Sequence, residues 1–226
     1  MDGDLCLRDG GAHTKGVIFD LWDTLIGWDE EMGDAFLAHV AEALGATPDE
    51  TRAAWDAGRP IRSRGPMLDY LRTLGLEGDV AGSIVDRRRE FARRAIVPVE
   101  GAAETLHELR RRGMKLGLLS VCSDEVPAVW AETAFAGLFD AEVFSCDVGL
   151  LKPDPRSYAV TCERLGVDPA DALFVGDGAN DELAGAERAG LRAVQIRLGG
   201  EEPRWPEARA WRGPRIATIP QVLELV

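Results

Sequence analysis

Short apolar runs recur along this chain, separated by amphipathic stretches. Each run is rich in β-branched residues or leucine and is bounded by turn residues, which is typical of buried strands. Six such runs are present: Val17–Leu21, Leu116–Ser120, Ala141–Phe144, Ala172–Val175, Ala193–Ile196 and Arg215–Ile219. Because parallel strands need long crossover connections, this alternation predicts a Rossmann-like α/β fold, in which helices cover both faces of a parallel sheet.

Helical patterns with clear stop signals fill the segments between the later runs. Ala102–Arg112 carries apolar residues on one face and an arginine-rich end, and Gly113 follows it. Pro155–Leu165 and Asp181–Ala189 are likewise each followed by a glycine. Glycine after the last helical residue is the usual helix terminator, so these three segments are predicted helices.

One long segment, residues 29–97, contains no convincing strand. It carries four helical patterns instead: Met32–Leu44, Pro48–Gly58, Pro66–Leu74 and Val80–Ile96. A segment of this length is too long for a simple connection. We therefore expect an inserted all-helical cap at 29–97, and an α/β core made of residues 1–28 and 98–226. The cap is expected to lie over the carboxyl ends of the strands, where an open α/β sheet binds its ligand.

Composition narrows the range of partners. The 226-residue chain has a formal net charge of −13, which disfavours nucleic-acid binding but leaves a small anionic substrate possible. No apolar run is long enough to span a membrane, and the segment Met1–Lys15 lacks the apolar core of a signal peptide, so it is expected to be a flexible leader. The four scattered cysteines are expected to be reduced thiols in a cytoplasmic protein. Whether the protein is a monomer or a homodimer is left open.

Polar side chains follow the first two predicted strands. The first strand runs into Asp20, with Thr24 shortly after it, and the second strand ends at Ser120. Taken alone, Asp20 is as well explained by a helix N-cap as by a reactive carboxylate. Serine is also common at strand ends, so neither residue by itself identifies a site.

A lysine stands out because the chain has only three, Lys15, Lys115 and Lys152. Lys152 lies in an apolar, proline-bounded segment just before a predicted helix, with Tyr158 six residues on. A purely structural lysine is disfavoured there, because cations are unfavourable at a helix N-terminus. Lys152 is therefore a candidate for a functional cation.

Three carboxylates follow the fourth predicted strand, at Asp177, Asp181 and Glu182. An acidic helix start explains Asp181 and Glu182 but explains Asp177 poorly. Carboxylates this close together repel one another unless a cation binds among them. The cluster is therefore a candidate metal site.

This order of Asp, Ser, Lys and an acidic cluster, each after a successive strand, resembles the haloacid dehalogenase-like hydrolase superfamily from about Val17 to the C-terminus. The resemblance implies that Asp20 is the nucleophile and that the helical insertion is the family's all-helical type 1 cap. It also implies a Mg²⁺ site made by Asp20, Asp177, the backbone carbonyl of Trp22, and either Asp181 or Glu182.

The chemistry that such residues support is nucleophilic. A carboxylate attacks phosphorus or carbon to form a covalent intermediate, which water then hydrolyses. Lys152 would offset the charge of the nucleophile and the substrate. The hydroxyl of Ser120, with Thr24 and the backbone at Val121, would contact the oxygens of the transferring group.

Trp22 departs from the family pattern. Most phosphatases that the chain resembles carry an aspartate two residues after the nucleophile, which protonates the leaving group. An indole cannot do this, and Asp23 follows it. The first interpretation is a Mg²⁺-dependent phosphatase of small phosphorylated metabolites that works without this acid or recruits Asp23.

Other interpretations remain. A metal-independent 2-haloacid dehalogenase also has an aromatic residue at the position of Trp22 and a Lys–Tyr pair like Lys152 and Tyr158, but Asp177 and Val121 do not fit it. An impaired member that binds a phosphorylated ligand is a further possibility. A phosphonate hydrolase is rejected, because the predicted cap has no lysine.

The sequence says less about which substrate the protein binds. In the predicted cap, Arg62 and Arg64 lie in a segment bounded by glycine and proline, where they are candidates to bind a substrate carboxylate or phosphate. A solvated basic stretch explains them equally well. The run Arg87–Arg89 is expected to be a solvated helix face, and the segment 201–214 an ordered surface loop.

Overall fold

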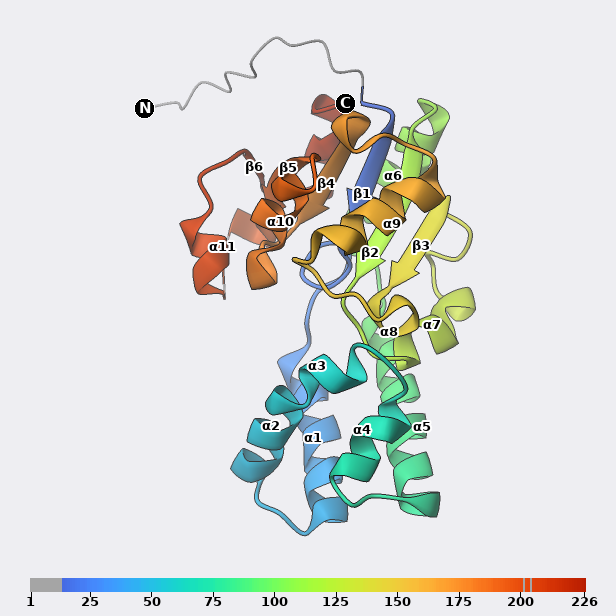
Figure 1. The fold of residues 1–226 in the computed structure, drawn as a ribbon, viewed down its shortest axis with the longest axis vertical. Coiled ribbons are helices and arrows are strands. Elements are labelled where there is room, and N and C mark those ends of the chain that lie inside the picture. Colours follow the sequence, from blue (N-terminus) through green and yellow to red (C-terminus); the bar gives the residue numbers. More distant parts are fainter. Residues whose placement is uncertain (1–13, 201, 204) are drawn as a thin grey trace.

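The computed structural model describes residues 14–200, 202–203 and 205–226. Its core is a six-stranded sheet with the order β3-β2-β1-β4-β5-β6, and all neighbouring strands pair in parallel (Figure 1). The strands are β1 (Gly16–Phe19), β2 (Lys115–Ser120), β3 (Ala141–Phe144), β4 (Ala172–Gly176), β5 (Arg192–Ile196) and β6 (Arg215–Ile216). The predicted α/β fold with a parallel sheet is confirmed.

Helices cover both faces of the sheet because the strand residues alternate between two hydrophobic clusters. Val17 and Phe19 pack on one face with α6 (Ala102–Arg111), α7 (Glu125–Val129) and the 3₁₀ helix η5 (Ile219–Glu224). Ile18 packs on the other face with α9 (Pro155–Leu165) and α10 (Glu182–Arg188). This two-residue alternation gives the core its three layers.

The remaining elements of the core are short. They are α8 (Ser145–Val148), α11 (Pro206–Ala210), and the 3₁₀ helices η1 (Trp130–Glu132), η2 (Pro169–Asp171), η3 (Ala179–Asp181) and η4 (Leu198–Gly200). Several of them lie in the connections that follow the strands, so they shape the loops at the carboxyl edge of the sheet.

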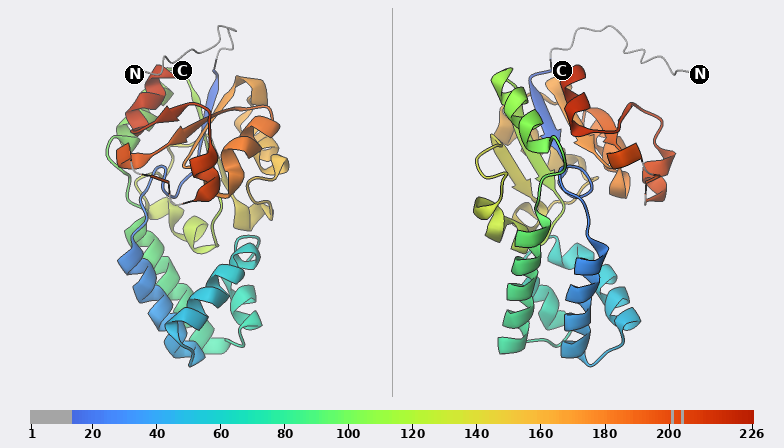
Figure 2. Two further views of the ribbon diagram at one scale, coloured as in Figure 1. Left: turned by 90° about the vertical axis from the view of Figure 1, so that its left-hand side faces the viewer. Right: turned by 180° about the vertical axis from the view of Figure 1, so that it is seen from behind.

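Between β1 and α6 the chain forms five helices that we call the helical unit. They are α1 (Glu30–Leu44), α2 (Pro48–Ala57), α3 (Arg59–Arg62), α4 (Met67–Thr73) and α5 (Gly78–Ala95). Their starts are encoded locally: Asp29 caps α1, and Thr47 with Glu50 forms a capping box on α2. The unit has its own apolar cluster around Phe36, and Figure 2 shows it as a separate lobe beyond the carboxyl ends of the strands.

The helical unit occupies the segment where the sequence predicted a cap at 29–97. That this lobe acts as a cap remains a prediction. It is tied to the core by an aromatic contact: the Trp22 ring lies 5.5 Å from Trp28 and 6.4 Å from Phe91 between ring centroids. The two segments that connect the unit to the core pair with each other, since Ile26 forms an isolated antiparallel bridge with Pro98.

The boundaries differ from the prediction in a few places. The first strand ends at Phe19, so Asp20 and Leu21 lie beyond it, and the last strand ends at Ile216. Four short helices, α3, α7, α8 and α11, were not predicted. Helix α11 lies in the segment expected to be an ordered surface loop, where Pro206 at its first turn favours a helix start.

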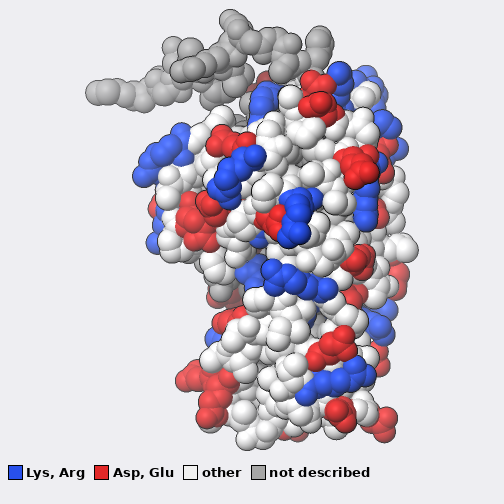
Figure 3. Space-filling model, viewed as in Figure 1, with Lys and Arg blue, Asp and Glu red and all other residues white. Residues whose placement is uncertain are grey.

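Other predictions concern cysteines, the leader and the membrane. Cys122, Cys146 and Cys162 are free and buried, as expected for reduced thiols. Cys6 and nearly all of the expected leader Met1–Lys15 lie outside the described residues. Within the described part of the chain, no helix has both the length and the apolar character needed to cross a membrane. On the face shown in Figure 3, acidic and basic side chains are interspersed.

Candidate active site

A cavity of about 670 Å³ lies between the carboxyl edge of the sheet and the helical unit. The core contributes Asp20, Lys152, Asp177 and Glu182 to its lining, and the helical unit contributes aromatic and arginine side chains. Residues far apart in the sequence meet here because parallel strands deliver their C-terminal residues to one edge. This is where an α/β fold of this kind binds a ligand.

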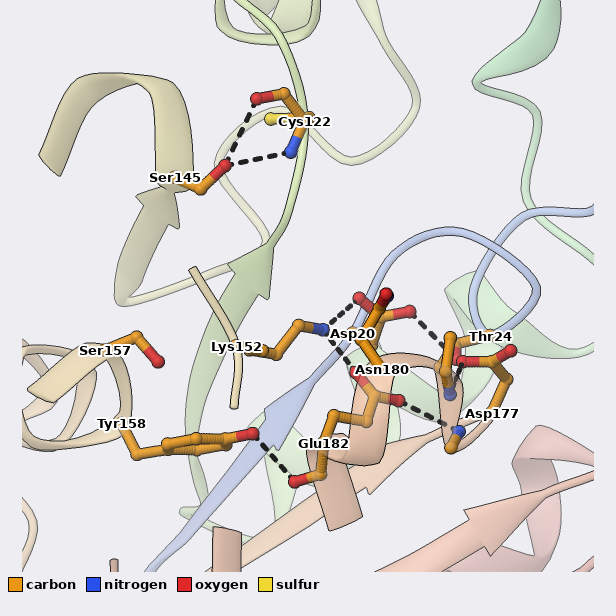
Figure 4. A network of polar contacts seen from close by, with 12 residues as sticks. Asp20, Thr24, Cys122, Ser145, Lys152, Ser157, Tyr158, Asp177, Asn180 and Glu182 are labelled. Carbon is orange, nitrogen blue, oxygen red and sulfur yellow. Dashed lines mark hydrogen bonds and ion pairs between the residues drawn. The ribbon is translucent and has the colours of Figure 1, made fainter. Parts of the chain in front are cut away.

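Lys152 is shared between two buried carboxylates (Figure 4). Its Nζ pairs with Asp20 Oδ1 and lies 2.6 Å from Glu182 Oε2, and all three side chains are less than a tenth exposed. Burial disfavours the ammonium, but the charges of Asp20 and Glu182 outweigh it and raise the pKa of Lys152 to about 12. Lys152 is therefore a permanent cation beside Asp20.

Glu182 is held on all sides. Its Oε1 accepts a hydrogen bond from the backbone N–H of Gly178 at 3.0 Å, and its backbone carbonyl accepts one from the Tyr158 hydroxyl at 2.7 Å. A Cβ on Gly176 would lie 2.1 Å from Glu182 Oε1, so only glycine leaves room for this carboxylate. The end of β4 is thus shaped to place Glu182 against Lys152.

Asp177 joins Asp20 and Glu182 in what we call the acidic group. Its Oδ1 accepts from the backbone N–H of Ala179 at 3.0 Å, and its backbone carbonyl accepts from the Gln195 side chain at 2.9 Å. Burial, followed by the charges of Glu182 and Asp20, raises the pKa of Asp177 to about 9. Repulsion within the group therefore opposes the charged form of Asp177.

The acidic group can hold a metal ion. Asp20, Asp177 and Glu182 each offer a carboxylate oxygen, and these atoms lie within 4.8 Å of one another. Oxygen-only donors with excess negative charge suit a hard divalent cation such as Mg²⁺. The residues present therefore fit the ion that the sequence suggested.

The two predicted hydroxyls, of Thr24 and Ser120, are in different states. The Thr24 hydroxyl donates to Asp20 Oδ2 at 3.3 Å and so fixes the second oxygen of that carboxylate. The Ser120 hydroxyl is fully buried, has no hydrogen-bond partner among the described residues, and does not belong to the cavity lining. A buried polar atom left unpaired is costly. Val121, the next residue, lines the cavity.

Trp22 and Asp23 both line the cavity, but they differ in environment. Trp22 packs against Trp28 and Phe91, so its ring belongs to the contact between the core and the helical unit. Asp23 has a positive φ of 55°, which is uncommon outside glycine and fixes the sharp turn after the strand. The place of the family's usual acid is thus filled by an apolar ring.

Two of the predicted site residues lie elsewhere. Asp181 is half exposed, and its carboxylate pairs with Arg188 at 3.2 Å. Of the two predicted alternatives, Asp181 and Glu182, it is therefore Glu182 that joins the acidic group. Arg64 is exposed, donates to the Pro60 carbonyl at 3.3 Å and does not line the cavity. Arg62 is buried and does line it.

Sequence reasoning also missed residues of the cavity. Arg88 was expected on a solvated face, but it is only 9% exposed, and it donates a hydrogen bond from the helical unit to Glu125 of the core. The signal was present, since Arg88 shares a helical face with Ile84 and Phe91, both buried. Nothing in the sequence marked Glu125.

Comparisons with known proteins bear on the family and the fold of the chain. The family model described as haloacid dehalogenase-like hydrolase matches residues 14–190. The chain is 36% identical over 201 residues to a glyceraldehyde 3-phosphate phosphatase of Methanopyrus kandleri, covering 82% of this chain and 84% of the relative. It is 36% identical over 105 residues to an (S)-2-haloacid dehalogenase of Burkholderia cepacia, covering 46% and 45%. A phosphatase structure from Thermococcus onnurineus superposes with a TM-score of 0.71 at 24% identity, covering 93% and 97%.

Gly176→Ala tests the packing of Glu182. Its Cβ would displace the carboxylate from Lys152, and overpacking of this kind costs about 1–3 kcal/mol. We expect the melting temperature to fall by roughly 2–4 °C per kcal/mol, measured by circular dichroism. Gly27→Ala is the matched control, because nothing lies within 4 Å of its Cβ. Equal melting temperatures for the two variants would contradict the placement of Glu182.

Asp177→Asn tests the acidic group. Folding raises the pKa of Asp177 to about 9, so this group lowers the stability of the fold progressively as the pH rises from the pKa of an unfolded aspartate toward 9. The neutral variant escapes this cost, and it should melt at a higher temperature than the parent at pH 7 in a chelating buffer. Mg²⁺ at about 100 times its dissociation constant should stabilise the parent by about 2.7 kcal/mol. This gain should vanish in Asp177→Asn and persist in Asp181→Asn. Equal Mg²⁺ responses in the two variants would show that the ion does not bind at Asp177.

Proposed function

The chain belongs to the haloacid dehalogenase-like hydrolases, and from that premise we propose that it is a Mg²⁺-dependent phosphatase of small phosphorylated compounds. The observation that carries this proposal is the buried Asp20–Lys152 pair in the lining of the cavity. A carboxylate nucleophile and a fixed cation meet there, and the unpaired Ser120 hydroxyl lies at the end of the neighbouring strand β2.

Asp20 is the nucleophile in this proposal. Lys152 pairs with one of its oxygens and Thr24 donates to the other, so the carboxylate is oriented. One oxygen of Asp20 attacks phosphorus, and the bond between phosphorus and the leaving oxygen breaks, giving a phosphoryl-aspartate. Water then attacks this phosphorus and releases inorganic phosphate and the free carboxylate.

The charge that moves onto the phosphoryl oxygens is met by the chain's own donors. In this proposal Lys152 holds these oxygens, and its contacts with Asp20 and Glu182 fix it before the reaction begins; the buried Ser120 hydroxyl is a further predicted donor. Asp20, Asp177 and Glu182 would hold Mg²⁺, with the backbone carbonyl of Trp22 as a further predicted ligand. When bound, the ion supplies positive charge that offsets the charge of the phosphoryl group.

Leaving-group protonation is the weak point of this site. The ring of Trp22 cannot donate a proton to an oxygen as an acid does, and general acid catalysis contributes about 10²–10⁴-fold. Substrates whose leaving groups depart without a proton are therefore favoured. Asp23 lines the same cavity and is the residue that could take over the role.

A 2-haloacid dehalogenase is the second candidate, because an aromatic residue such as Trp22 suits a halide leaving group, which needs no proton. Tyr158 gives it little support: its hydroxyl bonds the Glu182 carbonyl, and the residue does not line the cavity. The acidic group also disfavours a metal-free enzyme. A third candidate, an inactive member that binds a phosphorylated ligand, uses the same site without turnover.

Phosphatase assays separate these candidates. With Mg²⁺ the protein should hydrolyse p-nitrophenyl phosphate, and Asp20→Asn should lower kcat by at least about a thousandfold because the nucleophile is lost. Asp79→Asn, at an exposed position on α5, is the control. Halide release from 2-chloropropionate in a chelating buffer would favour the dehalogenase. Binding of phosphorylated compounds without any turnover would favour the inactive member.

A leaving-group series tests the role of Trp22. Across aryl and alkyl phosphates, kcat/KM should fall steeply as the pKa of the leaving alcohol rises, by at least about 100-fold between phenols and simple alcohols, because no acid assists. A flat series would contradict this. If Asp23 assists, Asp23→Asn should steepen the dependence; an unchanged slope in that variant would show that the site works without an acid.

A further inference from the structure

Three charged side chains meet in the cavity on the side of the helical unit. Arg62 comes from α3, Arg88 from α5 and Glu125 from α7 of the core, and their exposed fractions are 7%, 9% and 2%. Arg88 Nε donates to Glu125 Oε1 at 2.9 Å. None of the three belongs to the acidic group around Asp20.

Two polar groups of this cluster lack a complete set of partners. Glu125 Oε2 is buried and has no hydrogen-bond partner among the described residues. Arg62 lies 4.3 Å above the Trp55 ring and donates to the Trp55 carbonyl, but no described carboxylate forms an ion pair with it. A buried carboxylate oxygen and guanidinium left in this state are expensive, which indicates that a ligand completes them.

The charges define what such a ligand must carry. Among the buried charged residues of this cluster, two guanidiniums face one carboxylate, so an anionic group is favoured against Arg62, and a bidentate carboxylate matches the planar donor geometry of arginine. The free oxygen of Glu125 accepts hydrogen bonds only, so it faces a donor such as an ammonium or a hydroxyl. Both demands are met by a carboxylate with a donor group on the neighbouring carbon.

Aromatic side chains line the same cavity. Trp28, Phe36 and Trp55 belong to its lining, and Trp28 is 39% exposed, which is unusual for so large an apolar side chain. Trp22 continues this surface toward Asp20 through its contact with Trp28. A flat apolar body would pack on these rings, since aromatic pairs are stabilised beyond the burial of their area.

We propose that the substrate is an aryl phosphate whose far end carries a carboxylate beside an ammonium or hydroxyl group, of the class of phosphorylated aromatic amino acids. The phosphate meets Asp20, the ring packs on the tryptophans, and the far end binds Arg62 and Glu125. This inference rests on the proposed phosphatase function. The phenolate leaves with the electron pair of its bond to phosphorus and takes its proton from water, so Trp22 is no obstacle.

The test is a panel of four aryl phosphates with similar phenol leaving groups, assayed with Mg²⁺. The panel consists of O-phospho-L-tyrosine, its analogue without the amino group, tyramine phosphate without the carboxylate, and 4-ethylphenyl phosphate with neither. A hydrogen bond to a charged group contributes about 1.5–3 kcal/mol, so kcat/KM should fall by roughly 10–100-fold when the carboxylate is removed. A smaller fall is expected when only the amino group is removed.

Variants assign the preference to residues. Arg62→Met should lower the ratio of kcat/KM for phosphotyrosine to that for 4-ethylphenyl phosphate by at least about tenfold, and Arg62→Lys should recover part of it. Glu125→Gln should reduce the preference for the amino group. Arg87→Met, exposed on α5 beside Arg88, removes the same charge outside the cavity and should leave the ratio as it is.

The outcomes separate the two proposals. If 4-ethylphenyl phosphate and phosphotyrosine are hydrolysed equally well by the parent, the subsite is wrong while the phosphatase function stands; this result does not depend on whether any variant folds. If no member of the panel is hydrolysed, the phosphatase function fails. In that case, binding of phosphotyrosine to the parent by calorimetry, weakened at least about tenfold in Arg62→Met, would still support the subsite, and equal binding would overturn it.

Discussion

The buried ammonium of Lys152, shared by Asp20 and Glu182, is the interaction on which the rest of the site depends. It joins the end of β1 to the start of α10 through the loop before α9. Without this lysine the two carboxylates would be costly to bury, since an unpaired buried charge costs several kcal/mol. Gly176 belongs to the same arrangement, because the space of its missing side chain is filled by Glu182.

The same arrangement leaves an imbalance that points to function. Asp20, Asp177 and Glu182 bring three carboxylates to one lysine, and burial, followed by the charges of Glu182 and Asp20, raises the pKa of Asp177. A divalent cation would relieve this imbalance. On the opposite side of the cavity the buried charged residues are Arg62, Arg88 and Glu125. Aromatic side chains lie in the lining between these two groups of charges.

Much of this arrangement could be predicted from the sequence. The alternation of apolar runs and helices predicted the parallel sheet, and the resemblance to a known family pointed to Asp20, Ser120, Lys152 and Asp177; the structure brings Asp20, Lys152 and Asp177 together at the edge of that sheet. The choice between Asp181 and Glu182 could not be predicted, because it depends on two consecutive left-handed residues, Asn180 and Asp181, that turn the chain just before α10. Nor could the burial of Arg62 and the exposure of Arg64, which are set by tertiary packing around Trp55 rather than by the local sequence.

Trapping the covalent intermediate tests phosphoryl transfer through Asp20 most directly. The protein is mixed with Mg²⁺ and an aryl phosphate, quenched in acid during turnover, and digested for mass spectrometry. The peptide that contains Asp20 should carry one added phosphoryl group, and the adduct should be absent from Asp20→Asn. Steady hydrolysis with no adduct on this peptide, or an ester formed there from a 2-haloacid instead, would contradict the mechanism.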